Sequence, residues 1–171
     1  MNVASEATET KFAIREYRPA DFESLWKIDQ GCFPPGISYS QMELNSFLTK
    51  RNAIALVAQF QSNGNGEFAA AGSDPQIAGF VVAHSIRHKY GRILTLDIVA
   101  AARRYGLGTH LMLVCEERLH ALGCRQVYLE TAVNNEAALR LYHKLGYKVL
   151  DILPAYYASH ALDAFQMGKR L

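Results

Sequence analysis

The sequence predicts one α/β domain in which a mixed sheet carries helices on both faces. The chain has 171 residues, a length typical of one domain, and folding would bury about 70% of its surface, enough for a core without disulfides. Apolar residues follow strand or helix spacing in the order β-α-α-β-β-β-α-β-α-β-β, so helices join some strands and others pair as hairpins. We expect the domain over residues 12–171, after a disordered tail at 1–11 that has no periodic pattern.

The composition excludes several classes of protein. Eighteen Lys and Arg residues against sixteen Asp and Glu residues leave a net charge of +2, too balanced for a dedicated nucleic-acid binder. Cys32, Cys115 and Cys124 have no metal-ligand or disulfide spacing. The N-terminus has no apolar signal segment, and apolar runs such as 77–83 are too short to span a membrane. We therefore expect a cytoplasmic protein with no metal, no membrane contact and no direct nucleic-acid partner.

The first half of the chain predicts two helices among four strands. Strands are expected where apolar residues alternate or form short runs, and helices where they recur every three or four residues. Residues 61–76, which are rich in glycine and serine, are expected to form a long hairpin loop. The predicted elements are a strand at 12–17, a helix from Pro19 to a break at Gly31, a short helix at 41–49, and strands at 53–59, 77–86 and 93–99, the last two joined by a turn near Tyr90 and Gly91.

In the second half of the chain, local signals mark the ends of two helices. Gly123 follows an apolar helical pattern at 107–122, and Gly146 follows a second helix that ends at Leu145, which fits the preference for glycine after a helix. Asn134 or Asn135 can cap the start of that second helix. The remaining predicted elements are strands at 126–131, 147–152 and 164–169.

Gly106 and Gly108 lie between a predicted strand and a predicted helix, where they let the backbone approach a ligand closely. The unpaired N–H groups and the dipole of the helix start favour a phosphate or pyrophosphate, and Arg103 and Arg104 add positive charge. The segment lacks the Gly-Lys-Ser/Thr of a Walker loop and the third glycine of a Rossmann fingerprint. The alternative is a tight strand-to-helix turn with solvated arginines.

Residues 103–108 (RRYGLG) resemble the acyl-CoA pyrophosphate loop of the GNAT acetyltransferase superfamily. The preceding residues 94–99 (LTLDIV) resemble that family's fourth strand, and residues 134–147 (NNEAALRLYHKLGY) resemble its N-x-x-A-x-x-L-Y-x-x-x-G-F/Y helix. The resemblance covers about residues 12–171. It implies a twisted, mostly antiparallel GNAT sheet whose fourth and fifth strands splay apart to form an acyl-CoA cleft.

Within this superfamily, the sequence is most similar to protein N-α-acetyltransferases, especially the ribosomal-protein alanine (RimI) type. Such enzymes transfer an acetyl group from acetyl-CoA to a protein N-terminus by direct attack of the amine. The segments that carry this resemblance are 32–34 (CFP), 39–40 (YS), 128–130 (YLE), 156–157 (YY), 163–164 (DA) and Met167.

The resemblance implies a set of residues that bind the cofactor. The loop would hold the pyrophosphate, and the end of the fourth strand would line the pantetheine and offer main-chain N–H groups as oxyanion donors. A core role for Val99 and a purely capping role for Asn135 are the alternatives. The implied cofactor-binding residues are Ile98, Val99, Arg103, Arg104, Tyr105, Gly106, Leu107, Gly108, Thr109, Asn135 and Tyr142.

By the same resemblance, Glu130 is the candidate base, acting directly or through water, and Tyr142 is the candidate acid that protonates the leaving thiolate. The alternatives are a solvated carboxylate at a strand end for Glu130 and an apolar-face aromatic for Tyr142. At pH 7, deprotonating an α-amine costs about 1.4 kcal/mol, whereas deprotonating a lysine costs about 4.6 kcal/mol. One modest carboxylate therefore favours an N-terminal amine.

The acceptor site is implied to hold Phe33, Pro34, Tyr39, Tyr156 and Tyr157, although Phe33 and one of the tyrosines could instead belong to the core. The expected partners are acetyl-CoA and a protein N-terminus, for example that of a ribosomal protein. Two alternatives stay open. One is an acetyltransferase that acts on a small amine or a protein lysine, and the other is a non-catalytic acyl-CoA-binding module.

Overall fold

A computed structural model of the chain describes residues 11–61, 76–87 and 89–171. The predicted tail at 1–11, apart from its last residue, and the predicted loop at 61–76, apart from its two end residues, lie outside the described residues. Lys11 belongs to the ordered structure, because its carbonyl oxygen accepts a hydrogen bond of 2.8 Å from the N–H of Gln61.

The described residues form seven strands, four α-helices and three short 3₁₀ turns. No helix in this part of the chain is both long and apolar enough to cross a membrane. The strands are β1 (Phe12–Glu16), β2 (Ala53–Phe60), β3 (Ile77–Ile86), β4 (Tyr90–Ile98), β5 (Gln126–Ala132), β6 (Lys148–Tyr157) and β7 (Leu162–Arg170). The helices are α2 (Phe22–Cys32), α3 (Gln41–Leu48), α4 (Leu107–Ala121) and α5 (Glu136–Lys144), and the 3₁₀ turns are η1 (Pro19–Asp21), η2 (Ala100–Ala102) and η3 (Ala158–His160).

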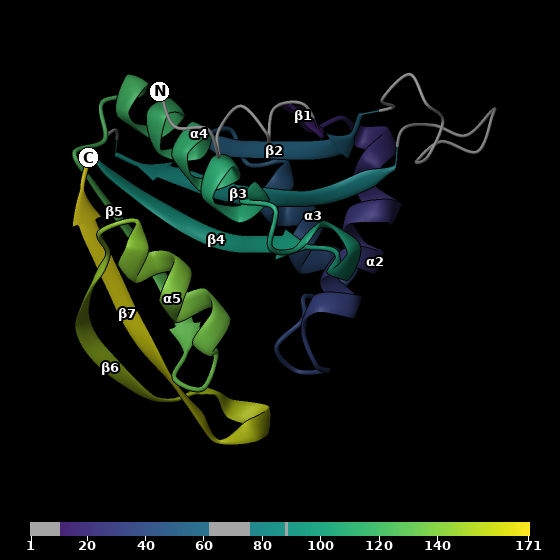
Figure 1. Cartoon of the computed structure of the whole chain (residues 1–171). Coiled ribbons are helices and arrows are strands. Elements are labelled where there is room, and N and C mark those ends of the chain that lie inside the picture. Colours follow the sequence, from purple (N-terminus) through teal and green to yellow (C-terminus); the bar gives the residue numbers. More distant parts are fainter. Residues whose placement is uncertain (1–10, 62–75, 88) are drawn as a thin grey trace.

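All strands form one sheet in the order β1-β2-β3-β4-β5-β7-β6. Neighbouring strands are antiparallel except β4 and β5, which are parallel. Helices α4 and α5 cover one face of the sheet, and α2 and α3 cover the other (Figure 1). The predicted mixed, mostly antiparallel sheet with helices on both faces is therefore confirmed.

Each face of the sheet has its own apolar core. The larger core contains Leu111, Cys115 and Leu119 of α4, packed against residues such as Val81 and Val127. The smaller core joins α2 and α3 to β2 and β3. This division follows from strand alternation, since successive side chains of a strand point to opposite faces.

The structure corrects two predicted boundaries in the first half. Helix α2 continues through Gly31 to Cys32, because the N–H of Phe33 still bonds to the carbonyl oxygen of Asp29 (3.1 Å). The turn predicted near Tyr90 and Gly91 is also wrong, since β4 already begins at Tyr90. The turn comes earlier, at Arg87, where the backbone has a φ of 52°.

The C-terminal hairpin is longer than the sequence predicts. Strand β6 ends at Tyr157, where the prediction ended at residue 152, and β7 begins at Leu162. The pairing of β6 and β7 shifts register between Leu153 and Tyr157, and Ala155 there has a φ of 49°. The irregular backbone hides the strand periodicity on which the prediction depends.

The parallel pairing of β4 and β5 stops early and opens the sheet. Only Tyr90, Gly91 and Arg92 of β4 have partners on β5, and the partner of Arg92 is Tyr128. Beyond this point the strands diverge. Strand β4 also carries a bulge, because Thr95 pairs with Val82 and Ile93 with Ala83, which leaves Leu94 as an extra residue. The predicted cleft between these strands is confirmed.

Candidate active site

Two cavities meet where β4 and β5 diverge. The first has a volume of about 600 Å³ and lies beside the start of α4. The second has a volume of about 460 Å³ and lies beneath the segment between α2 and α3 and the β6–β7 hairpin. We call the first the cofactor cleft and the second the acceptor cavity. The residues that line both are Cys32, Phe33, Leu96, Asn135, Ala138 and Tyr142.

The start of α4 gives the cofactor cleft a set of backbone donors. Gly106 caps the helix with a φ of 80°, a left-handed conformation that favours glycine. The first helical bond runs from the N–H of His110 to the carbonyl oxygen of Gly106. The N–H groups of Leu107, Gly108 and Thr109 therefore have no partner within the helix, and these residues line the cleft. This donor set fits a pyrophosphate.

Gly108 also lets α4 and α5 approach each other, since a Cβ atom there would lie 3.3 Å from Cδ2 of Leu141. Arg103 and Arg104 line the same cleft. The Nε of Arg103 donates to the carbonyl oxygen of Ile98 (3.0 Å), and its Nη2 lies 3.9 Å from Sγ of Cys32. Arg103 thus connects the end of β4 to the end of α2 while adding positive charge to the cleft.

The end of β4 directs some of its backbone groups into the gap. Val99 donates its N–H to the carbonyl oxygen of Ala78 on the β3 side (3.0 Å). Because backbone groups alternate in direction along an antiparallel strand, the N–H groups of Leu96 and Ile98 point toward the gap. Ile98 and Leu96 line the cofactor cleft. The prediction of Val99 as an oxyanion donor is therefore wrong, since its N–H is already bonded within the sheet.

The side chain of Tyr105 lies outside the cofactor cleft. Its ring packs near Phe12 with a centroid distance of 6.4 Å, and Nζ of Lys11 lies 4.0 Å above it. The side chain is 48% exposed. The Tyr105 side chain therefore contacts the N-terminal part of the domain, whereas binding of the pyrophosphate by its backbone N–H stays a prediction.

Asn135 and Tyr142 fit both interpretations that the sequence leaves open. Oδ1 of Asn135 accepts the N–H of Ala138 (3.2 Å) and caps α5, and the residue also lines both cavities. Tyr142 is 7% exposed and packs against the apolar core, yet it too lines both cavities. Burial, with a smaller contribution from Asp97, raises the pKa of Tyr142, so its phenol keeps its proton at neutral pH.

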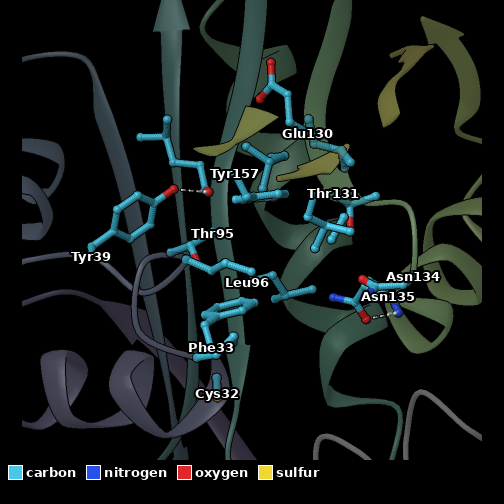
Figure 2. Close-up of a pocket in the computed structure, with 18 of the residues that line it drawn as sticks. Cys32, Phe33, Tyr39, Thr95, Leu96, Glu130, Thr131, Asn134, Asn135 and Tyr157 are labelled. Atoms are coloured by element: carbon cyan, nitrogen blue, oxygen red, sulfur yellow. Dashed lines mark hydrogen bonds between the residues drawn. The ribbon is translucent and has the colours of Figure 1, made fainter. Parts of the chain in front are cut away.

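The acceptor cavity brings together four of the five predicted acceptor residues: Phe33, Pro34, Tyr39 and Tyr157. Figure 2 shows Tyr39 on one side of this cavity and Asn135 on the other. The hydroxyl of Tyr39 donates to the carbonyl oxygen of Leu94 (3.0 Å), and burial raises its pKa. Burial likewise raises the pKa of Tyr157 to about 12.

Tyr156, the fifth predicted acceptor residue, does not line the cavity. Its ring meets that of Tyr157 edge-on at 5.1 Å, and its hydroxyl accepts a hydrogen bond from Nη2 of Arg92 (3.2 Å). Tyr156 and Tyr157 are consecutive residues of one strand end, so only one of them faces the cavity.

Glu130 lines the acceptor cavity and forms an ion pair with Arg92, in which Nε and Nη2 of the guanidinium each lie 3.1 Å from Oε2. The side chain of Glu130 is 12% exposed, so the alternative of a freely solvated carboxylate does not hold. In Figure 2 the carboxylate points away from the other labelled side chains of the cavity.

Sequence reasoning missed several residues of the site. Leu96 lines both cavities, and strand alternation from Ile98 could have indicated it. Arg92 belongs to the site through its contact with Glu130, and no local signal connects it to a residue 38 positions later. Asn134 and His160 also line the acceptor cavity. Across the part of the chain that the structure describes, no group of three or more His, Cys, Asp or Glu residues could hold a metal ion.

Comparisons with known proteins agree with this geometry. The family model described as acetyltransferase (GNAT) family matches residues 22–147. An N-alpha-acetyltransferase from Sulfurisphaera tokodaii is 27% identical, with both chains covered completely. An uncharacterised N-acetyltransferase from Methanocaldococcus jannaschii is 30% identical over 92% of this chain and 90% of its own.

Among solved structures, the crystal structure of Ard1 from Thermoplasma volcanium is similar, with a TM-score of 0.78 and 26% identity over 94% of this chain and 98% of that one. The family match, the splayed sheet and the donor-lined cleft agree with one another. The chain therefore belongs to the GNAT acetyltransferase family and is an acyltransferase that uses acetyl-CoA.

Proposed function

We propose that this enzyme transfers the acetyl group of acetyl-CoA to the N-terminal α-amine of a protein or peptide. The observation that carries the proposal is that the cofactor cleft and the acceptor cavity meet at Asn135 and Tyr142. An amine in the acceptor cavity and a thioester in the cleft would thus be brought together, and holding two reactants in register can supply about 7–11 kcal/mol.

Each part of the site has a role in this reaction. Acetyl-CoA, when bound, supplies the acetyl group and the leaving thiolate. The N–H groups at the start of α4 bind the pyrophosphate, and those of Leu96 and Ile98 donate into the gap, where they can stabilise negative charge on the carbonyl oxygen. These backbone groups need no rearrangement, because the strand and helix geometry already directs them.

Two protons move during the transfer. As the bond forms between the amine nitrogen and the acetyl carbon and the carbon–sulfur bond breaks, Glu130 accepts the proton that the amine loses, directly or through water. Tyr142 donates its phenolic proton to the departing sulfur, and the proton gained at Glu130 returns to Tyr142 through solvent. Because burial raises the pKa of Tyr142, the phenol carries its proton when the reaction begins.

An N-terminal amine is the acceptor that this site supports best. The candidate base is one carboxylate, that of Glu130, which forms an ion pair with Arg92, and carboxylates in general are modest bases. A modest base suits an α-amine, whose deprotonation at pH 7 costs about 1.4 kcal/mol, better than a lysine, for which the cost is about 4.6 kcal/mol. The Sulfurisphaera tokodaii relative, described as an N-alpha-acetyltransferase and similar along its whole length, supports the same acceptor. RimI-type specificity, a ribosomal-protein target and a cytoplasmic location stay predictions.

The proposal is tested by measuring CoA release from acetyl-CoA with three arrays of acceptors. These are peptides that differ in their first residues, the same peptides with a blocked N-terminus and an internal lysine, and small amines. We expect turnover only with free N-termini, and the preferred first residue then characterises the pocket around Phe33 and Tyr157. Turnover confined to lysines or small amines would discard the N-terminal acceptor, and binding of CoA with no turnover on any amine would indicate a non-catalytic module.

A further inference from the structure

Arg92 stands at the last position where β4 pairs with β5 before the two strands diverge. Its guanidinium reaches across the start of the gap to Oε2 of Glu130 on β5, with Nε and Nη2 each at 3.1 Å. Nη2 also donates to the hydroxyl of Tyr156 on β6 (3.2 Å). One side chain thus joins three strands at the narrow end of the gap that becomes the acceptor cavity.

The ion pair is partly shielded from solvent. The Arg92 side chain is 41% exposed and that of Glu130 is 12% exposed. Burial lowers the pKa of Arg92, but the charge of Glu130 and neighbouring tyrosines raises it by more, so the guanidinium stays charged. Screening by water and salt is weaker here than for a pair on the open surface.

Other titratable groups surround this pair. His84 on β3 and Tyr128 on β5 lie opposite Arg92. Tyr156 and Tyr157 approach from β6, and Tyr39 approaches from the segment between α2 and α3. On β7, Glu130 faces the uncharged Gln166. Among the described residues, Arg92 is the only cation paired with Glu130, and Oε1 of Glu130 has no hydrogen-bond partner.

We propose that Arg92 is a positioning residue that holds Oε2 of Glu130, so that Oε1 is the oxygen that accepts the amine proton, directly or through water. The inference rests on the proposed acetyl transfer to an amine in the acceptor cavity. The planar fork of a guanidinium fixes the orientation of the carboxylate that it binds.

A purely structural role is the competing explanation, since the same contacts also clamp β4, β5 and β6 together. The two roles differ in their dependence on Glu130. A clamp acts whether or not residue 130 carries a carboxylate. A positioning residue acts through the carboxylate, so its removal matters little once the carboxylate is gone.

The test measures kcat/KM at pH 7 for the wild type, Arg92→Met, Arg92→Lys, Glu130→Gln and the Arg92→Met, Glu130→Gln double variant. The acceptor is the best one found in the arrays. We expect Arg92→Met to lose about tenfold, because a misplaced base loses part of its usual contribution of about a hundredfold or more. Arg92→Lys, which keeps a cation beside Oε2, restores most of the activity.

In the Glu130→Gln background, Arg92→Met is expected to cause no further loss beyond about twofold, since residues that act through one another are not additive. Losses that multiply in the double variant would overturn the inference and leave a clamp. Wild-type activity of Arg92→Met would also overturn it.

Two controls separate folding effects from this outcome. Arg140→Met removes an arginine from an exposed ion pair with Glu136 and is expected to change nothing. Tyr156→Phe removes one contact of Arg92 but keeps the ion pair, so it should retain most of the wild-type kcat/KM; a loss as large as that of Arg92→Met counts against the inference. The kinetic assay uses whichever amine reacts in the arrays. The arrays therefore test the N-terminal acceptor, and the kinetics of the variants separately test the role of Arg92.

Discussion

Tyr39 and Leu94 are joined by a hydrogen bond at the irregular point of β4. The hydroxyl of Tyr39 donates to the carbonyl oxygen of Leu94 over 3.0 Å, and Leu94 is the extra residue of the β4 bulge. The Tyr39 ring is fixed in turn by an edge-on contact with Phe47 at 5.0 Å. The Tyr39 side chain, from the segment between α2 and α3, thus satisfies the carbonyl oxygen of Leu94 at the place where β4 turns away from β5.

Replacing Tyr39 with Phe should therefore loosen the acceptor cavity. We expect the free energy of unfolding to fall by about 0.5–1.5 kcal/mol, the typical net value of one hydrogen bond, and KM for the acceptor to rise while KM for acetyl-CoA stays unchanged. Urea unfolding and steady-state kinetics measure these quantities. Tyr90→Phe, at the other end of β4, is the matched control, since its hydroxyl has no hydrogen-bond partner among the described residues. An unchanged KM for the acceptor in Tyr39→Phe would show that the bulge does not depend on this bond.

Tyr142→Phe should remove the proton donor without removing the wall of the cofactor cleft. We expect kcat to fall by about a hundredfold or more, the usual contribution of a positioned acid, with KM for acetyl-CoA changed by less than about twofold. Because burial raises the pKa of Tyr142, the wild type should show no loss of activity from this group up to pH 9. Tyr105→Phe is the control, since Tyr105 contacts Phe12 and lies outside the cleft. Full activity of Tyr142→Phe would remove Tyr142 from the mechanism.

Gly106→Ala should impair acetyl-CoA binding through the backbone. The left-handed φ of 80° at Gly106 costs a residue with a Cβ atom about 1–2 kcal/mol, so we expect lower stability and a KM for acetyl-CoA raised about tenfold. Gly31→Ala serves as the control, because Gly31 lies within α2 and has nothing within 4 Å of its added Cβ. That change should stabilise the protein by about 0.5–1 kcal/mol. Equal effects of the two substitutions would contradict the assignment of Gly106 to the pyrophosphate loop.

Asp97 and Asp29 predict how stability depends on pH. Asp97 is fully buried, its Oδ1 accepts from the hydroxyl of Thr95 (2.5 Å), and its Oδ2 has no partner among the described residues. Burial raises the pKa of Asp97 well above its usual range, and raises that of Asp29 to about 6. The folded state then binds more protons than the unfolded state above about pH 4, so stability falls as pH rises through this window.

Asp97→Asn should remove the part of this pH-dependent loss of stability that is due to Asp97. We expect little change in stability at pH 4.5 and a gain of about 1–3 kcal/mol at pH 8, the cost of a buried unpaired polar group. Urea unfolding at the two pH values measures the difference, with the exposed Asp151→Asn as the control. A gain of the same size at both pH values would mean that the carboxyl of Asp97 is not protonated in the folded protein at pH 4.5.

The features that could be predicted from the sequence have local causes. Asn135 and Gly146 mark the two ends of α5 because capping depends on the residue at that position alone, and both act as predicted. The glycines at the start of α4 are recognisable for the same reason. Periodic apolar residues likewise identified the helices and most of the strands, because one face of each is buried.

The features that could not be predicted depend on backbone irregularities or on distant partners. The assignment of Val99 as a donor failed because the direction of each N–H in β4 is set by pairing with β3, which the sequence does not reveal. The prediction places both Tyr156 and Tyr157 in the acceptor site, whereas the backbone near Ala155, where the register shifts, leaves only Tyr157 facing the cavity. The contact of Arg92 with Glu130 joins two strands and has no signature in either one.

The early end of the β4–β5 pairing has a consequence for the stability of the protein. With three paired positions between them, β1–β4 and β5–β7 are two half-sheets whose shared seam contains few backbone hydrogen bonds. A ligand that binds in this seam and only to the native state adds its binding free energy to folding, about 2.7 kcal/mol at a hundred times its dissociation constant. Acetyl-CoA bound across this seam is therefore expected to act as a further connection between the half-sheets and to raise the free energy of unfolding.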